Sequence, residues 1–267
     1  MIFDTHTHYS DPVFDEDREA LLAGFCKAGV GRAVEVSASV SGLDGTLRLA
    51  QTHPQLYATV GVHPSECAEM TEETLAHMEE LLSQPKAVAV GEIGLDYHWD
   101  EPDRETQKKW FRAQLALAAR LDLPVVIHSR DAAQDTMEIL REHRRGGGVP
   151  RESTDDGSRP QGVVHCYSYS PEQAREYVRM GYFIGIGGVV TFKNARKLRE
   201  VVQDIPLGSL VLETDCPYMA PEPHRGERNS SLLLPLVTAK IAELKEISLE
   251  EVIRVTEKNA ERLYGLD

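Results

Sequence analysis

The sequence predicts an α/β fold, a (β/α)8 TIM barrel with a metal site at the carboxyl ends of its strands. The chain has 267 residues, which suits one barrel domain of about 250 residues. Short apolar runs alternate with helix-like segments, and such alternation indicates parallel strands. Histidines and acids, which are metal-binding residue types, stand at the ends of several apolar runs.

The expected strands are short runs of apolar, often β-branched residues. From Lys86 onward, small and β-branched residues alternate up to Glu92, which predicts a buried strand that ends at this carboxylate. The expected strands lie near residues 2, 33, 57, 87, 125, 162, 182 and 210. Because helices separate them, we expect all of them to be parallel members of one closed barrel.

The expected helices carry apolar residues at helical spacing. The first should span residues 15–28, with Gly29 and Gly31 ending it. Thr71 and Ser248 resemble capping residues and should begin two of the later helices. The others are expected over residues 41–52, 104–121, 132–143, 171–180 and 232–244.

Residues 144–161 break this pattern. The stretch is rich in Gly, Pro, Arg and Asp, and it keeps no apolar periodicity. Strand and helix patterns resume directly after it, so we expect a flexible insertion rather than a domain boundary. Residues 1–267 are therefore predicted to form a single barrel domain.

Composition excludes some classes of protein. With 41% hydrophobic and 27% charged residues, the chain can form an ordinary core. No apolar run reaches the roughly 18 residues of a membrane span, and no signal peptide is evident, so we expect no membrane partner. The four cysteines form no Cys-x-x-Cys pair, which indicates reduced thiols and a cytoplasmic location.

The net charge of −14 argues against generic nucleic-acid binding, which depends on Lys and Arg. An acidic chain instead suits divalent cations, because they offset the charge of carboxylate ligands. Any phosphate would then have to be held by bound metals and a few local bases.

Six side chains at five strand ends are expected to meet at one metal centre, with Glu92 in the middle. A charged residue at the end of a buried strand is costly unless something pairs with it. His6 and His8 are two residues apart in an extended segment, so they point to the same face. The full set is His6, His8, Glu92, His128, His165 and Asp215.

Further residues are candidates for contacts around this centre. His63 also follows a strand, and a role at the rim of the site and a structural role have equal weight. Arg130 and Arg225 are expected to hold a phosphate, and Tyr97 or Trp99 to stack on a base or sugar. Glu213 shares a strand face with Asp215 and is expected to support a ligand from behind.

With these residues assembled, the chain resembles the TatD family of metal-dependent hydrolases. The matching segments are residues 3–8, 61–64, 91–97, 124–130, 165–166, 191–194 and 212–218. The resemblance implies a barrel with one or two metal ions (Mg, Mn or Zn) and a deoxyribonuclease of the 3′-exonuclease type. Two positions depart from the family pattern, Ser230 after Asn229 and Tyr167 after Cys166.

The resemblance also implies how the ligands are shared. His6, His8, Glu92 and Asp215 would hold one ion, and Glu92, His128 and His165 the second.

The predicted function is therefore metal-dependent hydrolysis of a phosphodiester, either DNA or a small compound, with Glu92 and Asp215 as the catalytic residues. Two ions that share Glu92 would lie about 3.5–4 Å apart, which suits this reaction. The alternatives are an amide, ester or lactone hydrolase with the same centre, and a barrel without activity. A monomer or a weak homo-oligomer is expected.

Overall fold

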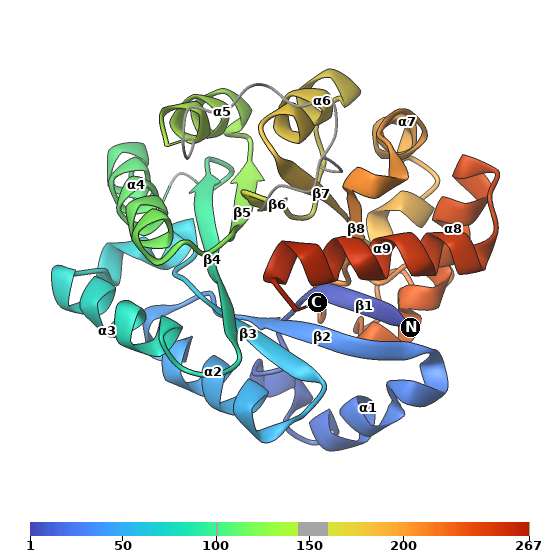
Figure 1. Cartoon of the computed structure of the whole chain (residues 1–267), viewed down its shortest axis with the longest axis horizontal. Coiled ribbons are helices and arrows are strands. Elements are labelled where there is room, and N and C mark those ends of the chain that lie inside the picture. Colours follow the sequence, from blue (N-terminus) through green and yellow to red (C-terminus); the bar gives the residue numbers. More distant parts are fainter. Residues whose placement is uncertain (100, 144–159, 267) are drawn as a thin grey trace.

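The computed structural model of the chain describes residues 1–99, 101–143 and 160–266. Its strands form one eight-stranded sheet in which sequence neighbours pair in parallel, and this confirms the predicted barrel (Figure 1). The strands are β1 (Ile2–Thr7), β2 (Val30–Val36), β3 (Leu56–Val60), β4 (Ala87–Asp96), β5 (Val125–Arg130), β6 (Gly162–Val164), β7 (Tyr182–Ile186) and β8 (Leu210–Leu212). Most of the predicted insertion, residues 144–159, lies outside the described residues.

The barrel closes between its first and last strands. Thr7 and Cys216 form an isolated parallel bridge just beyond the end of β8. The Asp215 amide donates to the carbonyl oxygen of His6 at 3.0 Å, and the His8 amide donates to that of Cys216 at 3.0 Å. The ladder that closes the barrel thus fixes the backbone of three predicted metal ligands.

A buried carboxylate strengthens the same seam. Asp4 accepts hydrogen bonds from the amide and the hydroxyl of Thr214, at 3.0 and 2.7 Å, and from the Ser231 hydroxyl at 2.7 Å. Burial raises the pKa of Asp4 to about 6, against the opposing effect of these hydrogen bonds. Burial of this carboxylate costs free energy, but its hydrogen bonds hold strand β1 to the segment after β8.

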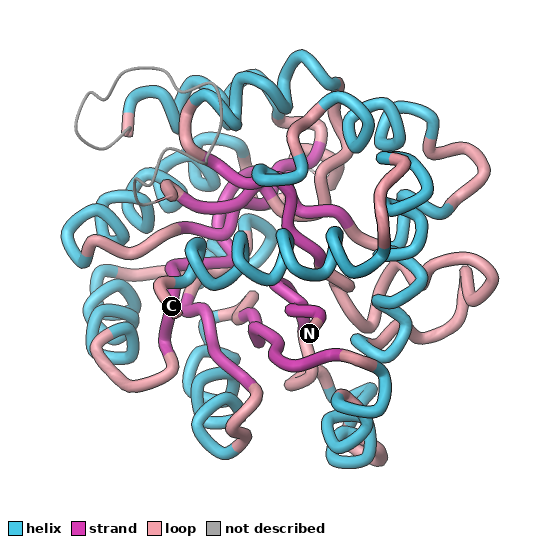
Figure 2. Tube along the Cα trace, turned by 45° about the vertical axis from the view of Figure 1, so that its right-hand side comes forward, coloured by secondary structure: helices cyan, strands magenta, loops and turns pink. Residues whose placement is uncertain are grey.

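Among the described residues, eight helices surround the barrel (Figures 1 and 2). They are α1 (Arg18–Gly24), α2 (Leu43–Thr52), α3 (Glu72–Leu82), α4 (Arg104–Leu121), α5 (Ala133–Glu142), α6 (Pro171–Arg179), α7 (Arg196–Asp204) and α8 (Leu234–Lys245). No helix within the described ranges combines the length and apolar character needed to cross a bilayer.

A ninth helix, α9 (Leu249–Tyr264), lies across the amino end of the barrel (Figure 1). The Asn259 side chain donates to the carbonyl oxygens of Leu207 and Leu210, at 2.9 and 2.7 Å, where β8 begins. The Tyr264 hydroxyl donates to the Thr5 carbonyl oxygen at 2.9 Å. The helix therefore closes one end of the barrel and leaves the carboxyl end open.

The apolar core has two parts. The larger one lies between the sheet and the surrounding helices. The smaller one fills the barrel and continues into α9, so that the last helix shares a core with the strands. Its members are Phe3, Val34, Val36, Val88, Ala89, Val126, Val163, Phe183, Val211, Ala260, Leu263 and Tyr264.

Several strand boundaries differ from the prediction. Strand β4 does not end at Glu92 but continues to Asp96, because its pairing with β5 extends through Gly94 and His128. A Cβ atom at Gly94 would lie 1.9 Å from the carbonyl oxygen of His128, so glycine permits this close approach. Strands β6 and β8 end before His165 and Asp215, which therefore stand on the loops that follow.

Some helix boundaries also differ from the prediction. The first predicted helix is shorter, because after α1 the hydrogen bonds tighten into a separate 3-10 turn over Cys26–Ala28. Helix α7 was expected only as a solvated helix face at Arg196, Lys197 and Arg199, without bounds, and its apolar side of Leu198, Val201 and Val202 was not predicted. The cap at Thr71 is confirmed by a reciprocal hydrogen-bond pair with Thr74.

Candidate metal centre

The six side chains predicted from the strand ends lie together at the open end of the barrel. Four of them form one cluster, in which the Nε2 atoms of His6 and His8 are 3.1 Å apart. His6 Nε2 is 3.5 Å from Glu92 Oε2 and 3.6 Å from Asp215 Oδ1. His8 Nε2 is 3.3 Å from Asp215 Oδ1 and 4.0 Å from Glu92 Oε2.

These separations suit a single cation. Ligand atoms at about 2.1 Å from a tetrahedral ion are about 3.4 Å from one another. The Nδ1 atom of His8 lies 3.0 Å from the carbonyl oxygen of Val36, which can only accept. Since Nδ1 therefore carries the proton, the lone pair on Nε2 faces two carboxylate oxygens and requires a positive charge between them.

The pKa of His8 also indicates that a positive charge is stabilised at this position. Burial lowers the pKa of this imidazole, but the hydrogen bond to Asp215 and the charges of Asp215 and Glu92 overcome burial and raise it to about 9. When no cation is bound, a proton is held where the donor atoms converge. The donor chemistry of the cluster thus fits a divalent metal that would replace this proton.

The second cluster shares Glu92 with the first. Glu92 Oε1 is 2.7 Å from His165 Nε2 and 2.8 Å from His128 Nδ1, and these two nitrogens are 3.4 Å apart. The two oxygens of Glu92 therefore face different clusters. Burial would raise the pKa of Glu92, but the surrounding imidazoles hold it well below its usual range, so the carboxylate is ionised.

The two clusters are in direct contact. The rings of His6 and His165 stack with their centroids 3.9 Å apart and their planes at 13°. Burial and the neighbouring His165 lower the pKa of His6 to about 4, so His6 is neutral near pH 7. Neutral imidazoles are the form that binds metals.

Asp96 is a site residue that the sequence analysis missed. Its Oδ2 atom is 3.1 Å from His128 Nε2, so it orients this imidazole and directs Nδ1 toward Glu92. Asp96 lies four residues beyond Glu92 on β4, and an even spacing on a strand places both side chains on one face. That signal was lost because the strand was expected to end at Glu92.

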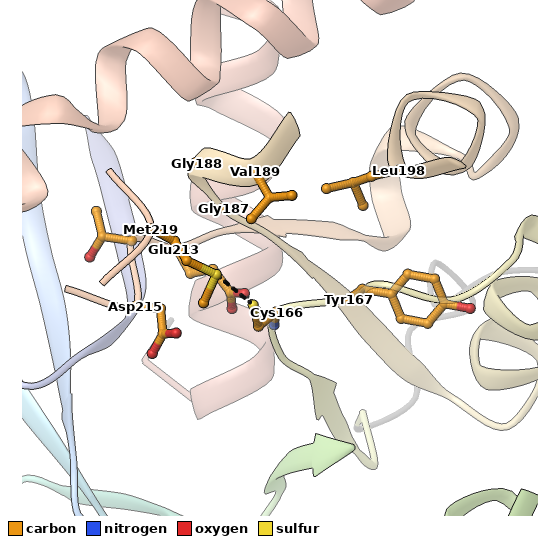
Figure 3. Close-up of a pocket in the computed structure, with 10 residues that line it drawn as sticks. Cys166, Tyr167, Gly187, Gly188, Val189, Leu198, Glu213, Asp215 and Met219 are labelled. Atoms are coloured by element: carbon orange, nitrogen blue, oxygen red, sulfur yellow. Dashed lines mark hydrogen bonds between the residues drawn. The ribbon is translucent and has the colours of Figure 1, made fainter. Parts of the chain in front are cut away.

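Glu213 lines a small pocket together with Cys166, Asp215 and Met219 (Figure 3). It accepts a hydrogen bond from the Cys166 amide and is 3.9 Å from His165 Nδ1. Burial raises the pKa of Glu213 to about 8, although His165 and the Cys166 amide oppose the shift. A Cβ atom at Gly185 would lie 2.3 Å from Glu213 Oε2, so this glycine makes room for the carboxyl group.

His63 lies beside the clusters but differs from the other histidines. Its Nε2 atom is 3.8 Å from Glu92 Oε1, whereas its Nδ1 atom accepts a hydrogen bond from the Ser65 amide at 3.2 Å. The proton of the neutral ring must therefore be on Nε2, which faces the site as a donor. Burial and the nearby His128 lower the pKa of His63 to about 3.

A cavity of about 1100 Å³ opens over the two clusters. Of the predicted substrate contacts, His63, Trp99 and Arg130 line it. Two others are not among its lining residues: the Tyr97 hydroxyl donates to Asp135 Oδ2 at 2.6 Å, and the Arg225 guanidinium lies 4.4 Å from the centre of the Phe192 ring.

The chain is similar to known proteins over nearly its whole length. A family model described as TatD related DNase matches residues 3–265. The metal-dependent hydrolase YabD of Bacillus subtilis is 40% identical over the full length of both chains. A relative in Erwinia tasmaniensis, named 3′-5′ ssDNA/RNA exonuclease TatD, is 32% identical over 99% of this chain and 100% of its own.

Among solved structures, the TatD homologue YJJV of Escherichia coli matches with a TM-score of 0.90 and 35% identity. The match covers 100% of this chain and 98% of that one. The similarity thus extends over the whole length of the chain.

Proposed function

Since the chain belongs to the TatD family of metal-dependent hydrolases, we propose that it hydrolyses phosphodiester bonds of DNA, from the 3′ end. The observation that carries the proposal is the position of Glu92, whose two oxygens face two donor clusters. Paired cation sites that share a ligand are typical of enzymes that cleave phosphodiesters.

His6, His8, Glu92 and Asp215 would hold one divalent ion, and Glu92, His128 and His165 the other. Bound there, the ions would supply a water molecule of lowered pKa and positive charge for the phosphoryl oxygens. The mixture of imidazole nitrogens and carboxylate oxygens favours Zn or Mn over Mg, although Mg is also used by phosphodiesterases.

The side chains of the site have distinct roles in this proposal. A water oxygen loses a proton and adds to phosphorus, one P–O ester bond breaks, and the leaving oxygen takes up a proton from the solvent. Asp215 lines the cavity and accepts the proton of the water. Burial would raise its pKa, but the hydrogen bond from His8 and nearby imidazoles lower it, so Asp215 is ionised and can act as a base.

His63 and Arg130 would act on the phosphate itself. His63 donates through Nε2 to a phosphoryl oxygen and contributes a hydrogen bond rather than a charge, since its ring is neutral. Arg130 is exposed at the cavity wall and pairs with the charge of the phosphate.

The test compares two substrates. The purified enzyme would be assayed with bis-p-nitrophenyl phosphate and with p-nitrophenyl acetate, each with Mn and with a chelator. We expect metal-dependent release from the phosphodiester. Metal-dependent release from the acetate alone would favour the ester, amide or lactone alternative instead. Single-stranded oligonucleotides labelled at the 5′ end would then show whether cleavage proceeds stepwise from the 3′ end.

We also propose that the whole chain acts as one domain, in the cytoplasm, as a monomer or a weak homo-oligomer. One sheet contains all eight strands, and α9 completes its core. The cysteines at 26, 67, 166 and 216 are all unpaired, as expected for a reducing compartment. Fractionation of cells and light scattering of the purified protein would test these points.

A further inference from the structure

Two aromatic side chains at the cavity are unusually exposed. Among the large hydrophobic side chains of the described residues, Trp99 is the most exposed at 68%, and Tyr218 follows at 55%. Both line the cavity over the donor clusters, whereas the other exposed ones, Met1, Val13 and Leu249, do not. Large apolar groups left in water at a binding cavity indicate a surface that a ligand covers.

The two rings belong to opposite sides of the barrel. Trp99 follows β4 and Tyr218 follows β8, and these strands stand four places apart in the eight-stranded sheet. The Tyr218 ring centre is 6.5 Å from that of His8 in the first cluster, and Asp96, at the end of β4 and three residues before Trp99, contacts His128 in the second. A strand laid across the cavity would therefore meet one ring on each side of the metal centre.

Tyr218 is held in place by its backbone. Its amide donates to the Asp215 carbonyl oxygen at 2.9 Å, and its own carbonyl oxygen accepts from the Asn229 side chain at 2.8 Å. The backbone that carries the ring is thus fixed relative to a predicted metal ligand, while the ring remains exposed. On the other side, the Trp99 ring meets His98 edge to face, with centres 4.7 Å apart and planes at 86°.

Charge alone does not explain how such a cavity would hold a nucleic acid. Of the described residues that line it, Arg130 is the only lysine or arginine, and four are acids: Asp11, Glu92, Asp96 and Asp215. Contacts to phosphates beyond the metal centre are therefore few. Stacking on aromatic rings is the remaining source of affinity, and it is tolerant of sequence because every base has a π face.

We propose that Trp99 and Tyr218 form a stacking clamp for two unpaired bases, one on each side of the phosphodiester at the metal centre. This proposal rests on the proposed function. It adds that the enzyme recognises the faces of the substrate's bases. A base in a duplex already stacks on its neighbours, so the clamp selects single strands and frayed ends.

The fluorescence of Trp99 gives a direct test. The chain has two tryptophans, and Trp110 is only 5% exposed, so quenching by a stacked base reports Trp99. The metal-loaded enzyme would be titrated with a hexanucleotide whose phosphorothioate linkages slow cleavage. A matched hexamer without bases keeps the same charges. We expect quenching and, with about tenfold from each of two stacked bases, a Kd about a hundredfold lower for the strand with bases.

Variants locate the clamp. Trp99→Ala and Tyr218→Ala should each raise the Kd of the strand with bases about tenfold and bring it toward that of the strand without bases. Trp99→Phe should recover most of the affinity but not the quenching. Leu249→Ala, which removes an exposed apolar side chain outside the cavity, should change neither.

Salt gives an independent measurement. With one arginine in the wall, the logarithm of the binding constant should fall with that of the salt concentration at a slope of about −1 or less steeply. A slope steeper than about −3 would indicate recognition of the phosphate backbone and would overturn the clamp.

Equal affinity for the two hexamers, or equal affinity for a blunt duplex, would also overturn the clamp. Either result could occur while the wild-type enzyme still cleaves bis-p-nitrophenyl phosphate, and the proposed function would then stand without the clamp. Complete failure to cleave any phosphodiester would instead refute the proposed function and the clamp with it.

Discussion

The two ends of the barrel are built from different chemistry. At the amino end, α9 continues the apolar core, and its Asn259 and Tyr264 side chains donate hydrogen bonds to backbone carbonyl oxygens of the barrel. At the carboxyl end, four of the six predicted ligands are buried next to one another below an open cavity: His6, Glu92, His165 and Asp215. One end buries apolar surface, and the other buries charge.

This difference indicates that the residues that stabilise the fold and the residues of the site are concentrated at opposite ends of the barrel. Buried charges cost free energy unless they are paired, so the carboxyl end is least strained when cations occupy it. The amino end supplies apolar burial at a distance from the chemistry. Substitutions at the two ends should therefore affect different measurements.

The largest effect is expected for Glu92→Gln. An amide of the same shape cannot hold two cations with two charged oxygens, so kcat/KM should fall on the order of a thousand-fold, the upper range for loss of one charge-stabilising group. Metal content, measured by atomic emission, should fall as well. Circular dichroism should show an unchanged fold, and a variant with full activity would refute the shared role of Glu92.

The next effect is expected at the other end, for Leu263→Ala. This side chain is 1% exposed in the core shared by the barrel and α9. Its truncation should lower the free energy of unfolding by about 2–5 kcal/mol. Denaturation in urea would measure this loss, and kcat on a phosphodiester should stay within about twofold, because the residue is far from the cavity. A loss of activity without loss of stability would contradict the separation of the two ends.

A smaller effect is expected for Arg130→Ala, with Arg225→Ala as its matched control. Both arginines are exposed, but only Arg130 lines the cavity, whereas Arg225 lies over Phe192. The first variant should raise KM for phosphodiesters about tenfold, equivalent to about 1.4 kcal/mol, and the second less than twofold. Equal increases would return Arg225 to the role predicted from the sequence.

The smallest effect is expected for Tyr264→Phe. The ring keeps its place in the inner core, and only the hydrogen bond to the Thr5 carbonyl oxygen is lost. The free energy of unfolding should fall by about 1–2 kcal/mol, because a buried carbonyl loses its partner. Thermal unfolding would detect this change. A larger loss, or any change in metal affinity, would show that the two ends are coupled.

Much of the architecture was accessible from the sequence. The strands were identified from apolar runs and the candidate ligands from residue type, and the structure brings the two together: the donor atoms of His6, Glu92 and His165 lie within 4.8 Å of one another. This was possible because a parallel barrel collects the carboxyl ends of all its strands at one face. Their role as metal ligands remains a prediction.

What the sequence did not predict depends on tertiary pairing and on loops. The length of β4 is set by its partner β5, and no local signal marks Asp96 as its last residue. Tyr97 and Trp99 are two apart and aromatic, and the loop between β4 and α4, not a strand period, decides that Trp99 faces the cavity. In the same way, Arg225 is a residue of a long loop whose path cannot be read from spacing.

The seam between β1 and the segment after β8 has a consequence for biosynthesis. Its bridge joins Thr7 to Cys216. Strand β1 therefore cannot pair with the segment after β8 until the ribosome has released the chain as far as Cys216. Until then, His6 and His8 lack Asp215, and the first donor cluster is incomplete. We therefore expect the ion of His6, His8, Glu92 and Asp215 to bind only after β1 has paired with the segment after β8.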